Sequence, residues 1–221
     1  MKIESFPRKL FLFRNNLCMF AQTQNELHNM KHMSILAVSL LALVACTPEK
    51  KQEADYSQYV NPMIGTDFTG NTYPGAQVPF GMVQLSPDNG LPGWDRISGY
   101  FYPDTTIAGF SHTHLSGTGA GDLYDISFMP VTRPYKEAPA PLGIYSTFSH
   151  NDEAASAGYY RVLLKDYNIN VELTATERCG IQRYTFPEAE ASVFLNLKKA
   201  MNWDFTLDSK IEVVDSTTIR G

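Results

Sequence analysis

Cysteine is scarce in this chain of 221 residues, and the three cysteines cannot build a disulfide framework. Cys18 and Cys46 lie within an N-terminal leader, which leaves Cys179 without a partner, so a buried thiol is its expected state. Helix-forming patterns are almost absent after residue 46, and neither internal repeats nor low-complexity tracts occur there. These absences exclude a disulfide-stapled scaffold and a repeat protein.

Positive charge is also scarce once the leader is set aside. Residues 47–221 hold 13 of the 18 basic and 21 of the 23 acidic side chains, a net charge of −8. Nucleic acid is a polyanion that is bound through clusters of Lys and Arg. The charge balance therefore argues against nucleic acid as a partner.

The N-terminal segment has the pattern of a bacterial lipoprotein signal. A basic start at residues 30–33 precedes an apolar run of 11 residues, Ile35–Ala45, which is too short to span a bilayer. The run ends in the lipobox-like Leu-Val-Ala-Cys at Leu43–Cys46, which predicts lipidation of Cys46 and a place in the bacterial cell envelope, in the periplasm or at the outer membrane or cell surface. Membrane contact is then expected only through this lipid anchor. A buried helix is the alternative, but it does not explain the cysteine.

The regions around this signal differ in kind. Residues 1–29 do not have the features of a signal peptide, and we interpret them as the result of a start codon assigned too far upstream. Residues 30–45 are interpreted as the signal peptide itself. Residues 46–57 are polar and predict a flexible tether. Residues 58–221 are expected to form one domain, since a chain of this size can bury a sizeable core.

Strand patterns recur through that domain, separated by Gly, Pro, Asn and Asp. The predicted strands are Gly81–Leu85, Thr106–His114, Ile126–Val131, Ile144–His150, Tyr159–Tyr167, Ile169–Thr176, Gly180–Phe186, Ser192–Leu197 and Lys210–Arg220. Apolar residues at period two from Ile169 to Ala175 are typical of a half-buried strand. The link at Tyr167–Asn168 is too short for a crossover helix, so its flanking strands are expected to pair antiparallel. The sequence therefore predicts an all-β antiparallel sandwich.

Aspartate is the only acidic residue between Val60 and Asp125, where Arg96 is the only Lys or Arg. Asp88 and Asp104 stand beside Asn-Gly and Pro, and turn formation explains them. Carboxylates in glycine-rich loops are better suited to bind sugar hydroxyls or a hard cation. The candidates for such binding are Asp67, Asp95 and Asp122.

His112 and His114 stand two residues apart on a predicted strand and would project from one face. This spacing occurs in cupin-type metal sites, but no third ligand follows within the next residues, so a cupin-like metal site is the weaker alternative. Two other interpretations remain for these histidines. They could form a buried hydrogen-bond network that supports the loop Gly117–Gly121, or one of them could contact a sugar directly.

Trp94 lies in the loop LPGWDR between glycine-rich turns, beside Asp95. An exposed indole can stack on the C–H face of a sugar while neighbouring charged groups bind its hydroxyls. A core tryptophan at one end of the sandwich is the alternative. From the loop alone the two interpretations stay open.

Three long motifs in this region occur in a fixed order. They are VNPMIGTDFTGNTYPGAQVPFGMVQLSPD (Val60–Asp88), GYFYPDTTIAGF (Gly99–Phe110) and FSHTHLSGTGAGD (Phe110–Asp122), followed by Tyr159–Tyr160, Glu172–Arg178 and Arg183–Pro187. Together they resemble the N-terminal domain of glycoside hydrolase family 92, the calcium-dependent exo-α-mannosidases, over roughly residues 58–200.

The resemblance implies an N-terminal β-sandwich that helps to form the sugar pocket of an inverting α-mannosidase. It implies mannose-containing glycans as partners and favours Trp94, Asp95, Asp67, His112, His114 and Asp122 as substrate-binding residues. It also implies that the catalytic carboxylates, and most of the calcium ligands, belong to a helical (α/α)6 barrel domain beyond residue 221. No catalytic residue and no metal ligand is therefore assigned in this chain. The chain is expected to be an inactive fragment, truncated towards the C-terminal end of its domain. A stand-alone mannose-binding lipoprotein without catalysis is the alternative.

Overall fold

The computed structural model describes residues 54–117, 123–139, 142–197 and 205–221. These residues form strands and short 3-10 helices, and no α-helix occurs among them. The strands are β1 (Ala76–Gln77), β2 (Gln84–Asp88), β3 (Thr106–Ile107), β4 (Gly109–Ser111), β5 (Ser127–Thr132), β6 (Ser146–Thr147), β7 (Glu153–Ser156), β8 (Tyr159–Leu164), β9 (Ile169–Ala175), β10 (Gly180–Thr185), β11 (Ala191–Asn196), β12 (Glu212–Val213) and β13 (Ile219–Arg220). The 3-10 helices are η1 (Ser57–Tyr59), η2 (Trp94–Arg96) and η3 (His150–Asp152).

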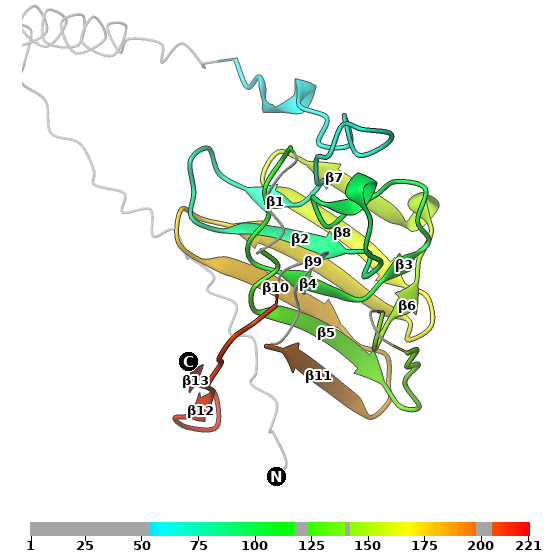
Figure 1. Cartoon of the computed structure of the whole chain (residues 1–221), viewed down its shortest axis with the longest axis vertical. Helices are drawn as coiled ribbons and strands as arrows, with labels where there is room; N and C mark the ends of the chain where they lie inside the picture. Colours follow the sequence, from blue (N-terminus) through cyan, green and yellow to red (C-terminus); the bar gives the residue numbers. More distant parts are fainter. Residues whose placement is uncertain (1–53, 118–122, 140–141, 198–204) are drawn as a thin grey trace, which may run out of the picture. The chain divides into compact units, whose positions relative to one another are not determined.

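Two antiparallel sheets make up most of the domain (Figure 1). One has five strands in the order β1-β2-β4-β5-β11, and the other has four in the order β10-β9-β8-β7. Two short antiparallel pairs, β3 with β6 and β12 with β13, complete the described strands. The prediction of an all-β antiparallel sandwich is confirmed.

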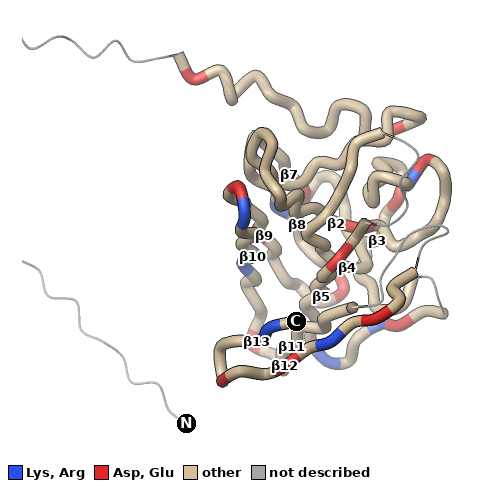
Figure 2. The backbone as a smooth tube through the Cα atoms, turned by 60° about the vertical axis from the view of Figure 1, so that its left-hand side comes forward, with Lys and Arg blue, Asp and Glu red and all other residues tan. Residues whose placement is uncertain are grey.

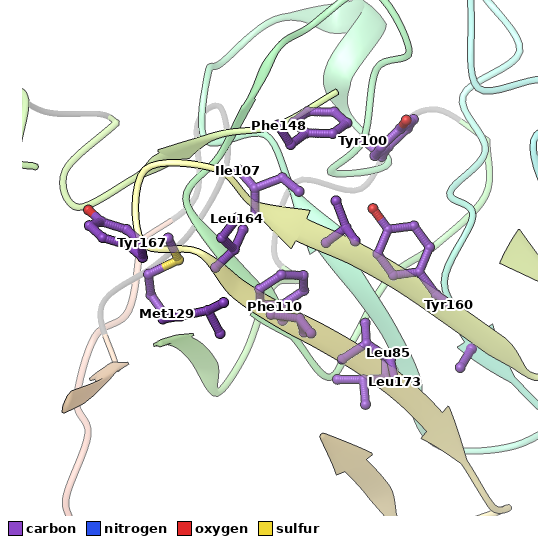
Figure 3. Packing of buried hydrophobic residues seen from close by; sticks show 14 of the residues in the cluster. Leu85, Tyr100, Ile107, Phe110, Met129, Phe148, Tyr160, Leu164, Tyr167 and Leu173 are labelled. Atoms are coloured by element: carbon purple, nitrogen blue, oxygen red, sulfur yellow. The ribbon is translucent and has the colours of Figure 1, made fainter. Parts of the chain in front are cut away.

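The core lies between the two sheets and draws on strands of both (Figure 3). Along β9, Ile169, Val171 and Leu173 are buried while the residues between them are more exposed, as the period-two pattern predicts. Tyr160 pairs with Leu173 across the β8–β9 ladder, so both strands present one buried face. The antiparallel pairing predicted from the short link is thus confirmed.

Several predicted strand bounds were wrong. The strand predicted over Thr106–His114 is divided into β3 and β4, because β3 pairs with β6 whereas β4 pairs with β2. It also ends at Ser111, before both histidines. The strand predicted over Lys210–Arg220 is a hairpin, because the Asp215 carboxylate accepts hydrogen bonds from the Thr217 amide and hydroxyl and turns the chain.

Cys179 is exposed, so the prediction of a buried thiol was wrong. It lies in the turn between β9 and β10, where its amide and its carbonyl oxygen both bond to Thr176. The strand alternation that buries Ala175 stops at this turn, which places the thiol outside the core.

Charge is spread over many strands and loops of the described chain, with most basic residues close to acidic ones (Figure 2). Ion pairs join Arg96 to Asp104, Arg183 to Glu172, Lys136 to Asp166, Arg133 to Glu190 and Arg220 to Glu212. In the part of the chain that the structure describes, no helix is long and apolar enough to cross a membrane.

Candidate functional site

Three loops at the ends of the strands carry the predicted site residues. The Asp67 loop (61–72), the Trp94 loop (93–104) and the His114 loop (112–117) are joined by hydrogen bonds. These run from Tyr102 N to Thr66 O (2.8 Å), from Ser98 Oγ to Thr72 O (3.0 Å) and from Gly117 N to Asn71 O (2.7 Å). The structure therefore links segments that are up to fifty residues apart into one assembly.

Glycines in and beside the Asp67 loop are required by close backbone packing. A Cβ on Gly70 would lie 2.2 Å from the carbonyl oxygen of Gly65, and one on Gly75 would lie 2.2 Å from that of Leu85. Gly65 itself has a φ of 82°, a conformation that favours glycine. In the described structure these glycines allow close contacts between segments of the protein's own backbone.

Trp94 lies in η2 and is 55% exposed, so the interpretation as a core tryptophan was wrong. Asp95 is exposed beside it. The next residue, Arg96, binds the Asp104 carboxylate with two hydrogen bonds of 2.6 and 2.5 Å and lies 4.7 Å above the Phe101 ring. The exposed Trp94 thus lies two residues before a guanidinium that a bidentate carboxylate holds in place.

Asp104 has a different role from the one predicted. Asp104 does more than form a turn, because its side chain is only 8% exposed and forms the bidentate pair with Arg96. This pair closes the Trp94 loop across eight residues. The paired aspartate is a structural part of the loop.

Asp67 is exposed in its loop, and its carboxylate accepts a hydrogen bond of 2.6 Å from the Phe68 amide. Phe68 has a φ of 53° and is 81% exposed. The Asp67 carboxylate is therefore positioned by a hydrogen bond within its own turn, and its exposed oxygens can accept further hydrogen bonds.

His114 is buried with Asp88, which corrects the turn interpretation of that aspartate. Both side chains are fully buried, and His114 Nε2 lies 2.9 Å from Asp88 Oδ1. His114 Nδ1 lies 2.7 Å from the carbonyl oxygen of Gln84, so both ring nitrogens face oxygen acceptors. Ser111 Oγ donates to Asp88 at 3.0 Å. Asp88 is the last residue of β2, in which the four residues from Leu85 to Asp88 are all buried, a setting that the Asp-Asn-Gly sequence concealed.

This group of Ser111, His114 and Asp88 is not a nucleophilic triad. In a serine hydrolase the serine and the carboxylate contact opposite nitrogens of the histidine. Here both oxygens approach the same nitrogen, Nε2, with Ser111 Oγ at 3.3 Å. The arrangement fixes the His114 loop to β2 and β4, as a buried network would.

His112 points to different surroundings, so the predicted common face is wrong. Its Nδ1 donates to the carbonyl oxygen of Ile126 at 2.8 Å, and its ring packs edge-on against Phe128. Burial lowers the pKa of His112, which keeps the ring neutral at pH 7 and leaves Nε2 as an acceptor. His112 lines an open cavity of about 670 Å³ together with Asp125, Arg178 and residues 206, 208–211 and 219–221.

The described residues do not gather the candidates into one pocket. The cavity at His112 is lined by neither Trp94, Asp95 nor Asp67. Asp122 and Cys46 lie outside the described residues. The structure therefore brings the Asp67, Trp94 and His114 loops together by hydrogen bonds, and places His112 beside a separate cavity.

The described part of the chain contains no cluster of side chains typical of a transition-metal site. There, no three His, Cys, Asp or Glu side chains lie close enough to hold an ion. A cupin-like site would need a free nitrogen on His114, but both of its nitrogens are engaged.

A second buried cluster escaped the sequence analysis. Glu153 accepts hydrogen bonds from Tyr100 and Tyr160 and lies 2.7 Å from His150 Nδ1. The spacing of His150 and Glu153 by three residues is the one local signal, since it places both beside η3. The two tyrosines come from distant segments, which no local pattern could reveal.

The described site is thus an exposed indole with neighbouring carboxylates, on loops at the ends of a β-sandwich. Comparison with known proteins identifies the class of domain. The model of the glycosyl hydrolase family 92 N-terminal domain matches residues 59–221, and the chain belongs to this family.

Solved structures and one curated protein resemble the chain. A family GH92 α-mannosidase of Bacteroides thetaiotaomicron, in complex with mannoimidazole, is 44% identical with a TM-score of 0.62, over 66% of this chain and 20% of its own. A family GH92 inverting mannosidase of the same species is 32% identical with a TM-score of 0.54, over 65% and 20%. A protein of Arthroderma benhamiae described as an uncharacterized secreted glycosidase is 26% identical over 73% of this chain and 21% of its own. The chain thus spans about a fifth of the length of these relatives.

Proposed function

We propose that this chain is the N-terminal domain of an α-mannosidase that hydrolyses terminal α-mannosidic bonds of glycans with inversion. The observation that carries the proposal is the family match over residues 59–221, together with 44% identity to an α-mannosidase solved with mannoimidazole. A second mannosidase, 32% identical, is described as inverting, which supports the stereochemical part.

The role of this domain is to supply loops to the sugar pocket. Trp94 offers a stacking surface, and Asp95 and Asp67 are exposed acceptors on loops that are hydrogen-bonded together. His112 lies apart from these loops, beside its own cavity, where its neutral ring offers Nε2 as an acceptor for a sugar hydroxyl. The buried His114 supports its loop. Asp122 is proposed to bind sugar hydroxyls directly, as a carboxylate in a glycine-rich sequence.

Hydrolysis needs two carboxyl groups, about 6.5–9.5 Å apart in inverting enzymes, with a water between them. We assign neither to this chain, because Asp88 and Asp104 are engaged in structural pairs. The carboxylates, and the calcium ligands, are proposed to belong to a helical domain that a longer polypeptide supplies.

The chain alone is therefore expected to lack mannosidase activity. Purified full chain, supplied with millimolar calcium and a synthetic α-mannoside, should release no mannose above background. Turnover of about 1 per second or more, typical of enzymes, would contradict the proposal that the catalytic groups lie elsewhere. Sequencing the gene beyond codon 221 provides the complementary test, with several hundred further codons expected and an immediate stop favouring a stand-alone mannose-binding module.

The proposed location is the bacterial cell envelope, with a lipid on Cys46 as the anchor. The relative described as secreted supports a place outside the cytoplasm, and the lipobox-like Leu43–Cys46 supports the anchor. Acyl chains contribute about 0.8 kcal/mol for each buried CH₂, far more than a polar tether can.

Substitution of Cys46→Ser should then move the protein from the membrane fraction to the soluble fraction. The reason is that serine cannot accept the thioether-linked lipid. Fractionation of cells that express each form, with Cys179→Ser as the matched control, measures the effect. Unchanged membrane association of Cys46→Ser would refute the anchor.

A further inference from the structure

Glu153 is a buried carboxylate that is surrounded by three hydrogen-bonding side chains. Its side chain is 1% exposed. The Tyr100 hydroxyl lies 3.0 Å from both of its oxygens, the Tyr160 hydroxyl donates to Oε1 at 2.5 Å, and His150 Nδ1 lies 2.7 Å from Oε2. A carboxylate removed from water needs such partners, because leaving one buried without them is costly.

The two tyrosines act as permanent donors in this cluster. Burial, aided by the charge of Glu153, raises the pKa of Tyr100 and that of Tyr160 well above their ordinary value. Both hydroxyls therefore keep their protons and hold Glu153 in place from the core side. Figure 3 shows Tyr100 and Tyr160 at one end of the core and Tyr167 at the other.

His150 connects this fixed carboxylate to the surface loops. Its second nitrogen, Nε2, lies 2.7 Å from the carbonyl oxygen of Tyr102. Its ring stacks on the Tyr102 ring with centroids 3.9 Å apart and planes 6° apart, and it forms an edge-on contact with Phe148 at 5.2 Å. His150 is therefore fixed by both nitrogens and by two rings.

Tyr102 in turn connects His150 to the Asp67 loop and the Trp94 loop, the two candidate sugar-contact loops. Its amide donates to Thr66 O in the Asp67 loop at 2.8 Å, one residue before Asp67. It is itself part of the Trp94 loop, which the Arg96–Asp104 pair closes around it. One histidine thus contacts, through one tyrosine, the segments that carry Trp94 and Asp67.

We propose that His150, held by Glu153, is a positioning residue that fixes the Trp94 and Asp67 loops in the geometry needed to contact sugar. The inference rests on the proposed function, since it assigns those loops to the sugar pocket. His150 touches no sugar itself, because its two nitrogens are engaged by Glu153 and Tyr102.

Fluorescence of Trp94 tests the positioning directly. The chain has two tryptophans, so Trp203→Phe leaves Trp94 as the single reporter. In this background, His150→Phe keeps an aromatic ring to stack on Tyr102 but removes both hydrogen bonds. We expect a shifted emission maximum and faster acrylamide quenching of Trp94, and partial recovery in His150→Asn, whose amide can still donate to Glu153.

Tyr167→Phe is the matched control. It removes a buried hydroxyl that bonds to Tyr145 O and Lys136 at the opposite end of the core. It should lower stability without altering Trp94 emission or quenching. Equal spectra for His150→Phe and the unsubstituted background, or an equal change in Tyr167→Phe, would overturn the positioning role.

Binding to mannan, measured by affinity electrophoresis on the same proteins, separates this inference from the proposed function. We expect binding to weaken about tenfold in His150→Phe, the scale of one hydrogen bond to a charged group. A changed Trp94 spectrum with no mannan binding by any form, the unsubstituted chain included, would support the positioning and contradict the sugar role. A changed spectrum with unaltered mannan binding would overturn the link between this cluster and sugar contact.

Discussion

Substitution of Asp88→Ala is expected to lower the free energy of unfolding by about 2–6 kcal/mol, because it leaves two buried polar groups without an acceptor, at about 1–3 kcal/mol each. The Asp88 and His114 side chains are both fully buried. The change would strip the acceptor from His114 Nε2 and from Ser111 Oγ together. Urea unfolding followed by circular dichroism measures the loss, with the midpoint moving at constant slope.

Two further variants sharpen this expectation. Asp88→Asn keeps the shape and one acceptor oxygen, so a smaller loss of about 1–3 kcal/mol is expected. Asp125→Ala removes an exposed carboxylate bonded to Thr113, and should stay within about 0.5 kcal/mol of the unsubstituted chain. Equal stability of Asp88→Ala and Asp125→Ala would show that the buried network contributes nothing measurable.

The strands of the sandwich could be predicted because their signals are local. Alternation from Ile169 to Ala175 is decided by which face meets the core, and the structure buries the expected residues. The failures occurred where the deciding contact is distant. Asp88 looked like a turn residue beside Asn89 and Gly90, yet His114, twenty-six residues later, makes it a buried partner.

The candidate site divides in the same way. The exposure of Trp94 agrees with one of the two interpretations that its loop sequence left open, and the structure was needed to decide between them. The separate surroundings of His112 and His114 could not be predicted, because they follow from the end of β4 at Ser111, where strand alternation no longer applies. The Glu153 cluster joins Tyr100, Tyr160 and His150 over as many as fifty-three residues, and only the fold brings them together.

Substitution of Trp94→Ala should weaken binding to mannan by about tenfold to a hundredfold, equivalent to about 1–3 kcal/mol for the loss of one apolar stacking surface. Trp94 is 55% exposed and is not among the buried residues of the core cluster, so the substitution should disturb the core little. The same substitution at a core tryptophan would instead cost about 3–5 kcal/mol of stability. Trp94→Ala is therefore expected to change binding strongly and the melting temperature little.

Trp94→Phe is the conservative control, since a smaller ring retains part of the stacking surface and should lose less affinity than alanine. Exposed Tyr59 provides a second control, because Tyr59→Ala removes a surface aromatic that is 77% exposed outside the three loops. Affinity electrophoresis in mannan and thermal unfolding on one preparation of each variant give both quantities. A large fall in melting temperature with unaltered mannan binding would remove Trp94 from the sugar site and assign it a structural role. An equal loss of binding in Tyr59→Ala would show that mannan is held by scattered aromatic contacts rather than by the Trp94 loop.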